Sequence, residues 1–189
     1  MSKFQIDETF FAPRTPVSIA AIGDSGEALL IRSCLESLGA AVTLHLIGTP
    51  GDFLKVLNQS RDATRYLVIS GHGDEIGFVF GEYHSGIDFS VLTKGSLPAT
   101  ALSGRINLPG TIVISTACDT GSPQMAEAFL KGGAAAYIAP NGYPGGSETA
   151  LFVHMLFHQI MVETVSASKA VETVRNFHTG LESFRCFME

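Results

Sequence analysis

Two reactive side chains each follow a short apolar run in this sequence. His72 comes just after the run 66–70, and Cys118 comes directly after the run 111–117. Both runs are short, rich in β-branched residues and closed by glycine, which is typical of strands buried on both faces. Neighbouring strands lie about 4.8 Å apart, so an imidazole and a thiol at one sheet edge could exchange a proton. That is the arrangement of a cysteine nucleophile activated by a histidine.

The hydrophobic pattern predicts strands that alternate with helices along the chain. Asp24 and Glu27 have the spacing of a capping box at the start of the first helix. The segment 74–109 breaks the alternation, and its pattern predicts a hairpin of two short strands, 76–80 and 87–92. The other expected strands are 17–23, 42–47, 66–70, 111–116 and 135–139, and the expected helices are 24–38, 50–57, 122–131, 147–163 and 166–178.

This alternation predicts an α/β fold with a mostly parallel central sheet and helices on both faces, because strand–helix–strand units make right-handed crossovers. Sites in such folds lie at the carboxyl ends of the strands, where His72 and Cys118 are both expected. A length of 189 residues favours a single domain over 1–189, with 1–16 as an irregular N-terminal arm.

Composition argues against several classes of function. The net charge of −6 and the lack of a Lys/Arg cluster argue against binding to nucleic acid or to an anionic membrane surface. The N-terminal segment lacks the apolar core of a signal peptide, and the apolar stretch 150–162 is too short to span a bilayer. Three scattered cysteines indicate free thiols in a reducing compartment, so we expect a cytoplasmic protein.

The sequence gives no sign of a cofactor or a metal centre. His154 and His158 share one helix face, but no third ligand accompanies them. Cys34 sits on the inward stripe of a helix and is expected to be a core residue. Cys186, in the C-terminal tail, is expected to be incidental.

The blocks Ser70-Gly71-His72-Gly73 and Thr116-Ala117-Cys118-Asp119-Thr120-Gly121 resemble the catalytic blocks of caspase-like (clan CD) cysteine peptidases. The His precedes the Cys by 118 − 72 = 46 residues, and the caspase form has a separation of about 50. The order of elements over 17–177 is most similar to that of the bacterial CHAT-type branch, so the resemblance implies a caspase-like three-layer sandwich. The chain departs from it in having no Trp and in carrying Thr116 where caspases have Gln. A caspase-like preference for Asp is therefore not expected.

The resemblance implies that Cys118 attacks a peptide carbonyl while His72 carries the proton to the leaving amine. It also implies an oxyanion hole made by the backbone N–H groups of Gly73 and Cys118. Glycine at position 73 would leave room for substrate to approach. The helix that begins at 122–123 should lower the pKa of the Cys118 thiol through its dipole, whereas Asp119 should raise that pKa.

The resemblance also suggests where substrate binds. Clan CD peptidases that cut after Lys or Arg carry acidic side chains near the end of the first strand, and Asp24 stands there. Asp119 is a second candidate, and Thr116 is a further candidate substrate contact. These carboxylates suggest a basic residue before the scissile bond (P1), but the favoured interpretation of Asp24 is that it caps the first helix.

Two other functions stay open from the sequence. One is a catalytically silent caspase-like module that binds or regulates a partner, and the other is a thiol-dependent amidase or transferase acting on a small molecule. For the peptidase, the expected partner is a peptide or protein substrate, and exposed edge strands would allow a homodimer.

Overall fold

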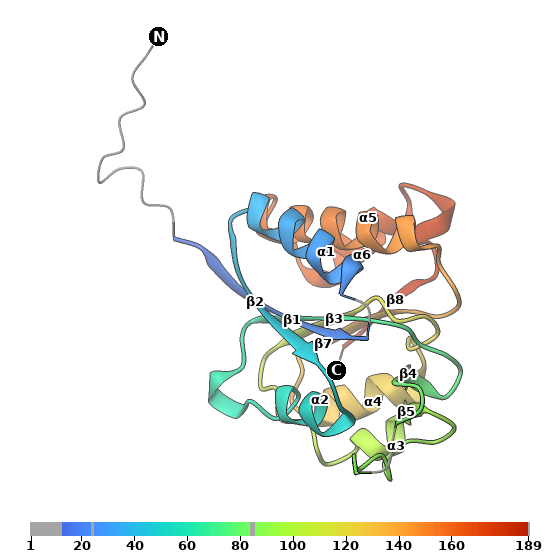
Figure 1. The fold of residues 1–189 in the computed structure, drawn as a ribbon. Helices are drawn as coiled ribbons and strands as arrows, with labels where there is room; N and C mark the ends of the chain where they lie inside the picture. Colours follow the sequence, from blue (N-terminus) through green and yellow to red (C-terminus); the bar gives the residue numbers. More distant parts are fainter. Residues whose placement is uncertain (1–12, 24, 84–85, 189) are drawn as a thin grey trace.

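A computed structural model describes residues 13–23, 25–83 and 86–188 (Figure 1). Its main sheet has six strands in the order β2-β1-β3-β6-β7-β8. All neighbouring strands are parallel except β7 and β8, which are antiparallel. The strands are β1 (Thr15–Ile22), β2 (Ala40–Ile47), β3 (Tyr66–Ser70), β6 (Ile112–Ser115), β7 (Ala136–Pro140) and β8 (Phe184–Phe187). The first strand thus begins two residues inside the predicted arm.

Helices cover both faces of this sheet, as Figure 1 shows. One face carries α1 (Gly26–Ser37), α5 (Gly146–Phe157) and α6 (Ala167–Arg175). The other carries α2 (Pro50–Val56), α3 (Ala99–Leu102) and α4 (Pro123–Lys131). Each face has its own hydrophobic cluster. The mostly parallel three-layer α/β fold expected from the sequence is therefore confirmed.

The strands β3 and β6 are buried on both faces because their side chains alternate between the two clusters. Val68 packs in the cluster under α1, α5 and α6, while Leu67 and Ile69 pack in the cluster on the opposite face. The two strands are neighbours, with Ile69 paired to Ser115 in the last step of the register. The chain segments that leave their carboxyl ends therefore start side by side.

In the segment between β3 and β6, the second of the two short strands lies at a different place from the one predicted. β4 (Gly77–Val79) pairs with β5 (Ser96–Pro98), and not with any part of 87–92. A side chain at Gly77 would place its Cβ 2.0 Å from the Leu97 carbonyl oxygen, so glycine permits this pairing. Asp74 also holds the two strands together, since its carboxylate accepts hydrogen bonds from the Gly77 N–H and the Ser96 hydroxyl.

The C-terminal part contains an edge strand that the sequence pattern did not reveal. β8 joins the sheet where the Phe184 ring stacks on Phe152 of α5, with 3.6 Å between ring centroids. Cys186, expected to be incidental, pairs with Ile138 in this strand. The predicted helix 147–163 ends earlier as α-helix and continues as a π-helical turn, His158–Val162. Short 3₁₀ turns occupy Ser60–Asp62 and Thr179–Leu181.

Within the described residues, no helix combines the length and the apolar character needed to cross a bilayer.

Candidate active site

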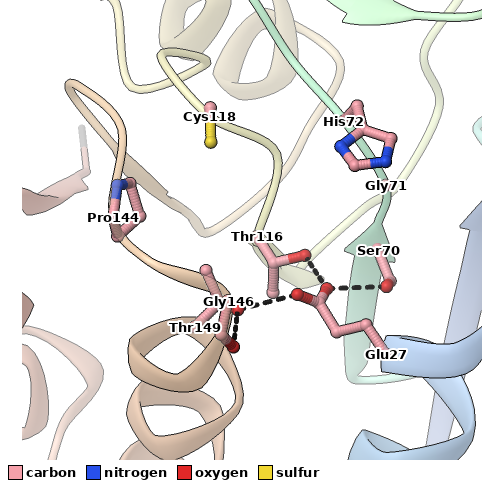
Figure 2. A pocket seen from close by; sticks show the side chains of 9 residues that line it. All are labelled: Glu27, Ser70, Gly71, His72, Thr116, Cys118, Pro144, Gly146 and Thr149. Carbon is pink, nitrogen blue, oxygen red and sulfur yellow. Dashed lines mark hydrogen bonds between the residues drawn. The ribbon is translucent and has the colours of Figure 1, made fainter.

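His72 and Cys118 line one pocket of about 270 Å³ at the carboxyl edge of the sheet (Figure 2). His72 follows β3 and Cys118 follows β6, so the parallel pairing of these strands brings both residues to the same edge. His72 is exposed and Cys118 is half-buried. The complete lining consists of Glu27, Ser70, Gly71, His72, Thr116, Cys118, Pro144, Gly146 and Thr149.

Gly73 sets how closely the two loops approach. A Cβ atom on Gly73 would lie 2.2 Å from the carbonyl oxygen of Cys118 and 3.1 Å from the carbonyl carbon of Ala117. Glycine is therefore required at position 73 because the backbone of one loop packs against the backbone of the other. The sequence indicated a different reason, namely room for substrate.

Hydroxyl groups beneath the nucleophile fix the shape of its loop. The Thr120 hydroxyl donates to the Ala117 carbonyl at 2.8 Å and lies 2.9 Å from the Ser115 hydroxyl. Gly121 donates its N–H to the Pro140 carbonyl at 2.8 Å, and a Cβ atom there would meet that same oxygen at 2.7 Å. The Thr-Gly pair after the nucleophile is thus explained by packing beneath Cys118.

Asp119 joins the nucleophile loop to the loop between β7 and α5. It donates its N–H to the Gly142 carbonyl at 2.8 Å, and the Gly142 N–H returns a bond to Asp119 Oδ1 at 2.9 Å. Its φ of 53° lies in the left-handed region, which Asp adopts more readily than most residues. Asp119 does not line the pocket, so in this structure its visible role is to position a loop.

Glu27 is the carboxylate that lines the pocket, and the sequence interpretation missed it (Figure 2). Ser70 and Thr116 donate hydrogen bonds to Glu27 Oε1, and Thr149 donates to Oε2 at 2.7 Å. All three donor residues are almost completely buried. Four segments of the chain therefore converge on one carboxylate: the first turn of α1, the ends of β3 and β6, and the start of α5.

The alternation of side chains explains this convergence. Val68 and Ile114 point toward α1 and α5, so Ser70 and Thr116, two residues further along, point to the same face. The Glu27 side chain, which the sequence pattern assigned to a capping box, lies in the pocket. The helix begins at Gly26, with Ser25 in the N-cap position and no side-chain cap. Asp24 lies outside the described residues.

The pKa of the Cys118 thiol is raised above its ordinary value. Burial is the largest cause, and the negative charges of Glu27 and then Asp119 act in the same direction. The hydrogen bond from the Cys118 backbone N–H acts in the opposite direction but is outweighed. The sequence left open whether the dipole of α4 or the charge of Asp119 would dominate, and in the structure the balance favours a raised pKa of the Cys118 thiol.

The two backbone N–H groups expected to form the oxyanion hole lie on the loops that carry His72 and Cys118. Among the described residues, neither Gly73 nor Cys118 donates its N–H to a backbone carbonyl. The same part of the structure contains no hydrogen bond to the His72 imidazole and no group of three metal-binding side chains. His154 and His158 lie on α5 and its π-helical turn, away from the lining of the active-site pocket.

Comparison with solved structures shows which fold this is. The chain is similar to the complex of Porphyromonas gingivalis RgpB pro- and mature domains, with a TM-score of 0.57 and 13% identity, over 93% of this chain and 47% of that chain. It is likewise similar to the Arg-specific cysteine proteinase gingipain R, with a TM-score of 0.57 and 14% identity, over 93% of this chain and 46% of that one. The chain thus spans about half the length of these proteinases. No protein-family model and no curated protein matches it.

Proposed function

With a fold shared with clan CD cysteine proteinases as the premise, we propose that this protein is a cysteine endopeptidase that cleaves after a basic residue. The observation that carries the proposal is one pocket lined by a thiol, an imidazole and a carboxylate that is held by three hydroxyls. A CHAT-type relationship, which the sequence blocks suggest, stays part of the proposal.

In the proposed mechanism, the Cys118 thiol transfers its proton to His72, and the sulfur attacks the carbonyl carbon of the scissile bond. Negative charge then develops on the carbonyl oxygen, which the N–H groups of Gly73 and Cys118 would stabilise. His72 returns the proton to the leaving amine. Water hydrolyses the resulting thioester, and the thiol is restored.

The preference for a basic side chain rests on Glu27. Among the described residues, no lysine or arginine lines the pocket or pairs with Glu27. Its bonds from Ser70, Thr116 and Thr149 orient the carboxylate but do not neutralise its charge. A guanidinium or ammonium group would complete this site with charge-assisted hydrogen bonds. The Arg-specific proteinase with a similar fold supports the same choice of substrate.

A fluorogenic peptide library with every P1 residue tests both parts of this function. We expect cleavage after Arg or Lys, and we expect Cys118→Ala to abolish it without unfolding the protein. Replacing P1 Arg by its neutral isostere citrulline should lower kcat/KM by about 10- to 100-fold, because a charged hydrogen bond contributes about 1.5–3 kcal/mol. Glu27→Gln should remove most of this difference. Cleavage that is indifferent to P1 charge would contradict the specificity, and turnover by Cys118→Ala would contradict the mechanism.

A further inference from the structure

The same pocket raises the question of how Cys118 becomes a nucleophile. Four titratable groups surround the Cys118 thiol. Glu27 on α1 and His72 after β3 line its pocket. Asp119, on the loop of Cys118 itself, and Tyr143, on the loop between β7 and α5, interact with it electrostatically. Two of these groups are carboxylates, and none is a lysine or an arginine. An unoccupied pocket of this kind favours the neutral thiol over the thiolate.

Glu27 is the group whose charge a substrate would change. It lines the pocket together with Cys118, and Figure 2 shows the carboxylate held on one side of the space into which the sulfur points. A cation bound to Glu27 would cancel its negative charge within the same half-enclosed space. The attraction between that cation and a thiolate would then offset the repulsion between Glu27 and the thiolate.

We propose that a basic side chain bound against Glu27 activates Cys118, so that recognition of the P1 cation and formation of the thiolate are energetically coupled. This inference rests on the proposed function and adds regulation to its site. On binding, the S–H bond of Cys118 breaks, the proton passes to the His72 ring, and the pair of charges persists until the sulfur attacks. No oxidant or other co-reactant takes part.

Coupling of this kind must be reciprocal. A cation that promotes the thiolate binds more tightly once the thiolate has formed, by the same factor. The thiol would therefore be less reactive toward oxidants and alkylating agents in the resting protein, and most reactive when the correct side chain is bound. Selectivity for basic residues would then be expressed in the chemical step as well as in binding.

The rate of Cys118 alkylation by iodoacetamide as a function of pH measures this directly. Mass spectrometry of the Cys118 peptide separates its signal from those of Cys34 and Cys186. The alkylation rate is recorded as a function of pH for three samples. These are the protein without ligand, the protein with saturating n-butylguanidinium, and the protein with n-butylurea as a neutral probe of matched shape. We expect the guanidinium to move the midpoint of the profile downward by about 0.5–1 pH unit, equivalent to about a 3- to 10-fold change in the ionisation constant. The urea should not move it.

Variants locate the effect at Glu27. In Glu27→Gln the midpoint without ligand should already lie below that of the wild type, and guanidinium should no longer move it. Glu172→Gln removes an equal charge from α6, where Glu172 pairs with Lys169 and does not line the pocket, and it should behave as wild type. The wild-type comparison alone decides the proposal if Glu27→Gln does not fold.

Two results would overturn the coupling: an unchanged midpoint with bound guanidinium, or no guanidinium binding at all. Hydrolysis of peptides after Arg with an unchanged midpoint would refute the coupling and leave the peptidase function standing. A shifted midpoint without hydrolysis of any peptide would support the coupling and refute the peptidase function.

Discussion

At the scale of single residues, the site depends on one glycine that has no role in proton transfer. Gly73 lets the backbone of the His72 loop contact the backbone of the Cys118 loop, because there is no room for a side chain between its Cα and the Cys118 carbonyl. The distance between imidazole and thiol is therefore set by backbone contact. Catalysis by such a pair is sensitive to displacements of about 1 Å.

Gly73→Ala should consequently lower kcat/KM by about 100-fold or more, since a misplacement of about 1 Å has effects of that size. Its Cβ cannot be accommodated 2.2 Å from the Cys118 oxygen, so the loops must separate. Steady-state hydrolysis of an Arg peptide measures the loss. Gly51→Ala is the matched control, because its Cβ would meet only the Thr49 hydroxyl at 3.7 Å. Normal activity of Gly73→Ala would contradict the argument.

The hydroxyls around Glu27 provide a second prediction at this scale. Thr149→Val keeps the shape of the side chain but removes the hydroxyl that lies 2.7 Å from Oε2 of Glu27 and 2.8 Å from the Gly146 carbonyl oxygen. The carboxylate should then be less well oriented, and kcat/KM for Arg peptides should fall by about 5- to 10-fold, given about 1 kcal/mol for one such bond. Citrulline peptides should be affected much less. Thr149→Ser retains the donor and should restore the wild-type ratio of the two rates.

At the scale of elements, the site is assembled from loops that follow neighbouring strands. The β3 and β6 loops carry the reactive pair, and the loop after β7 carries Pro144 and leads into Gly146 at the start of α5. Strand pairing aligns where these loops begin, but it does not hold their tips. The reciprocal hydrogen bonds between Asp119 and Gly142 hold the second and third loops together.

Replacing Asp119 separates its effect on loop position from its charge. Asp119→Asn can keep the hydrogen bond from the Gly142 N–H and tolerates the left-handed backbone, so the fold should be retained. Loss of the negative charge should move the midpoint of Cys118 alkylation to lower pH, because Asp119 raises that pKa. Asp119→Ala also loses the side-chain bond and should destabilise the protein by about 1–2 kcal/mol. An alkylation midpoint unchanged in Asp119→Asn would show that its charge does not reach the sulfur.

At the scale of the whole molecule, one histidine couples stability to pH. His45 lies on the edge strand β2, where burial lowers its pKa below the ordinary value of 6.5. Its Nε2 atom is buried without a hydrogen-bond partner among the described residues. The unfolded chain therefore takes up a proton at this position at higher pH than the folded chain does.

The sign of the pH dependence follows from linkage. Stability rises with pH wherever the unfolded state binds more protons, so the free energy of unfolding should fall as pH drops below about 6.5, the ordinary value for histidine. His45→Leu should make the stability curve flatter between that pH and the lowered pKa of the folded state. Urea unfolding at a series of pH values measures this. Unfolding at pH 8, where His45 is neutral in both states, corrects for any change in packing. Parallel curves for the two proteins would refute the prediction.

The large-scale fold was accessible from sequence because it depends on patterns that the chain repeats. Short β-branched runs between amphipathic helices predict a parallel sheet with two covered faces, and the similar solved structures have that fold. The short strands were harder to predict from sequence. The segment 87–92 has the composition of a strand, yet β5 forms at Ser96–Pro98 because Gly77 and Asp74 favour that partner.

The sequence by itself placed His72 and Cys118 at one sheet edge, since each ends a buried strand and the ends of parallel strands align. It could not determine which carboxylate would share their pocket. Asp24 and Asp119 were the candidates, whereas the structure brings in Glu27. That choice depends on how α1 and α5 cross the sheet and on which face Ser70 and Thr116 point toward. Local spacing indicates only a helix cap at Glu27, because contacts between segments up to 122 residues apart are fixed by packing of the whole chain.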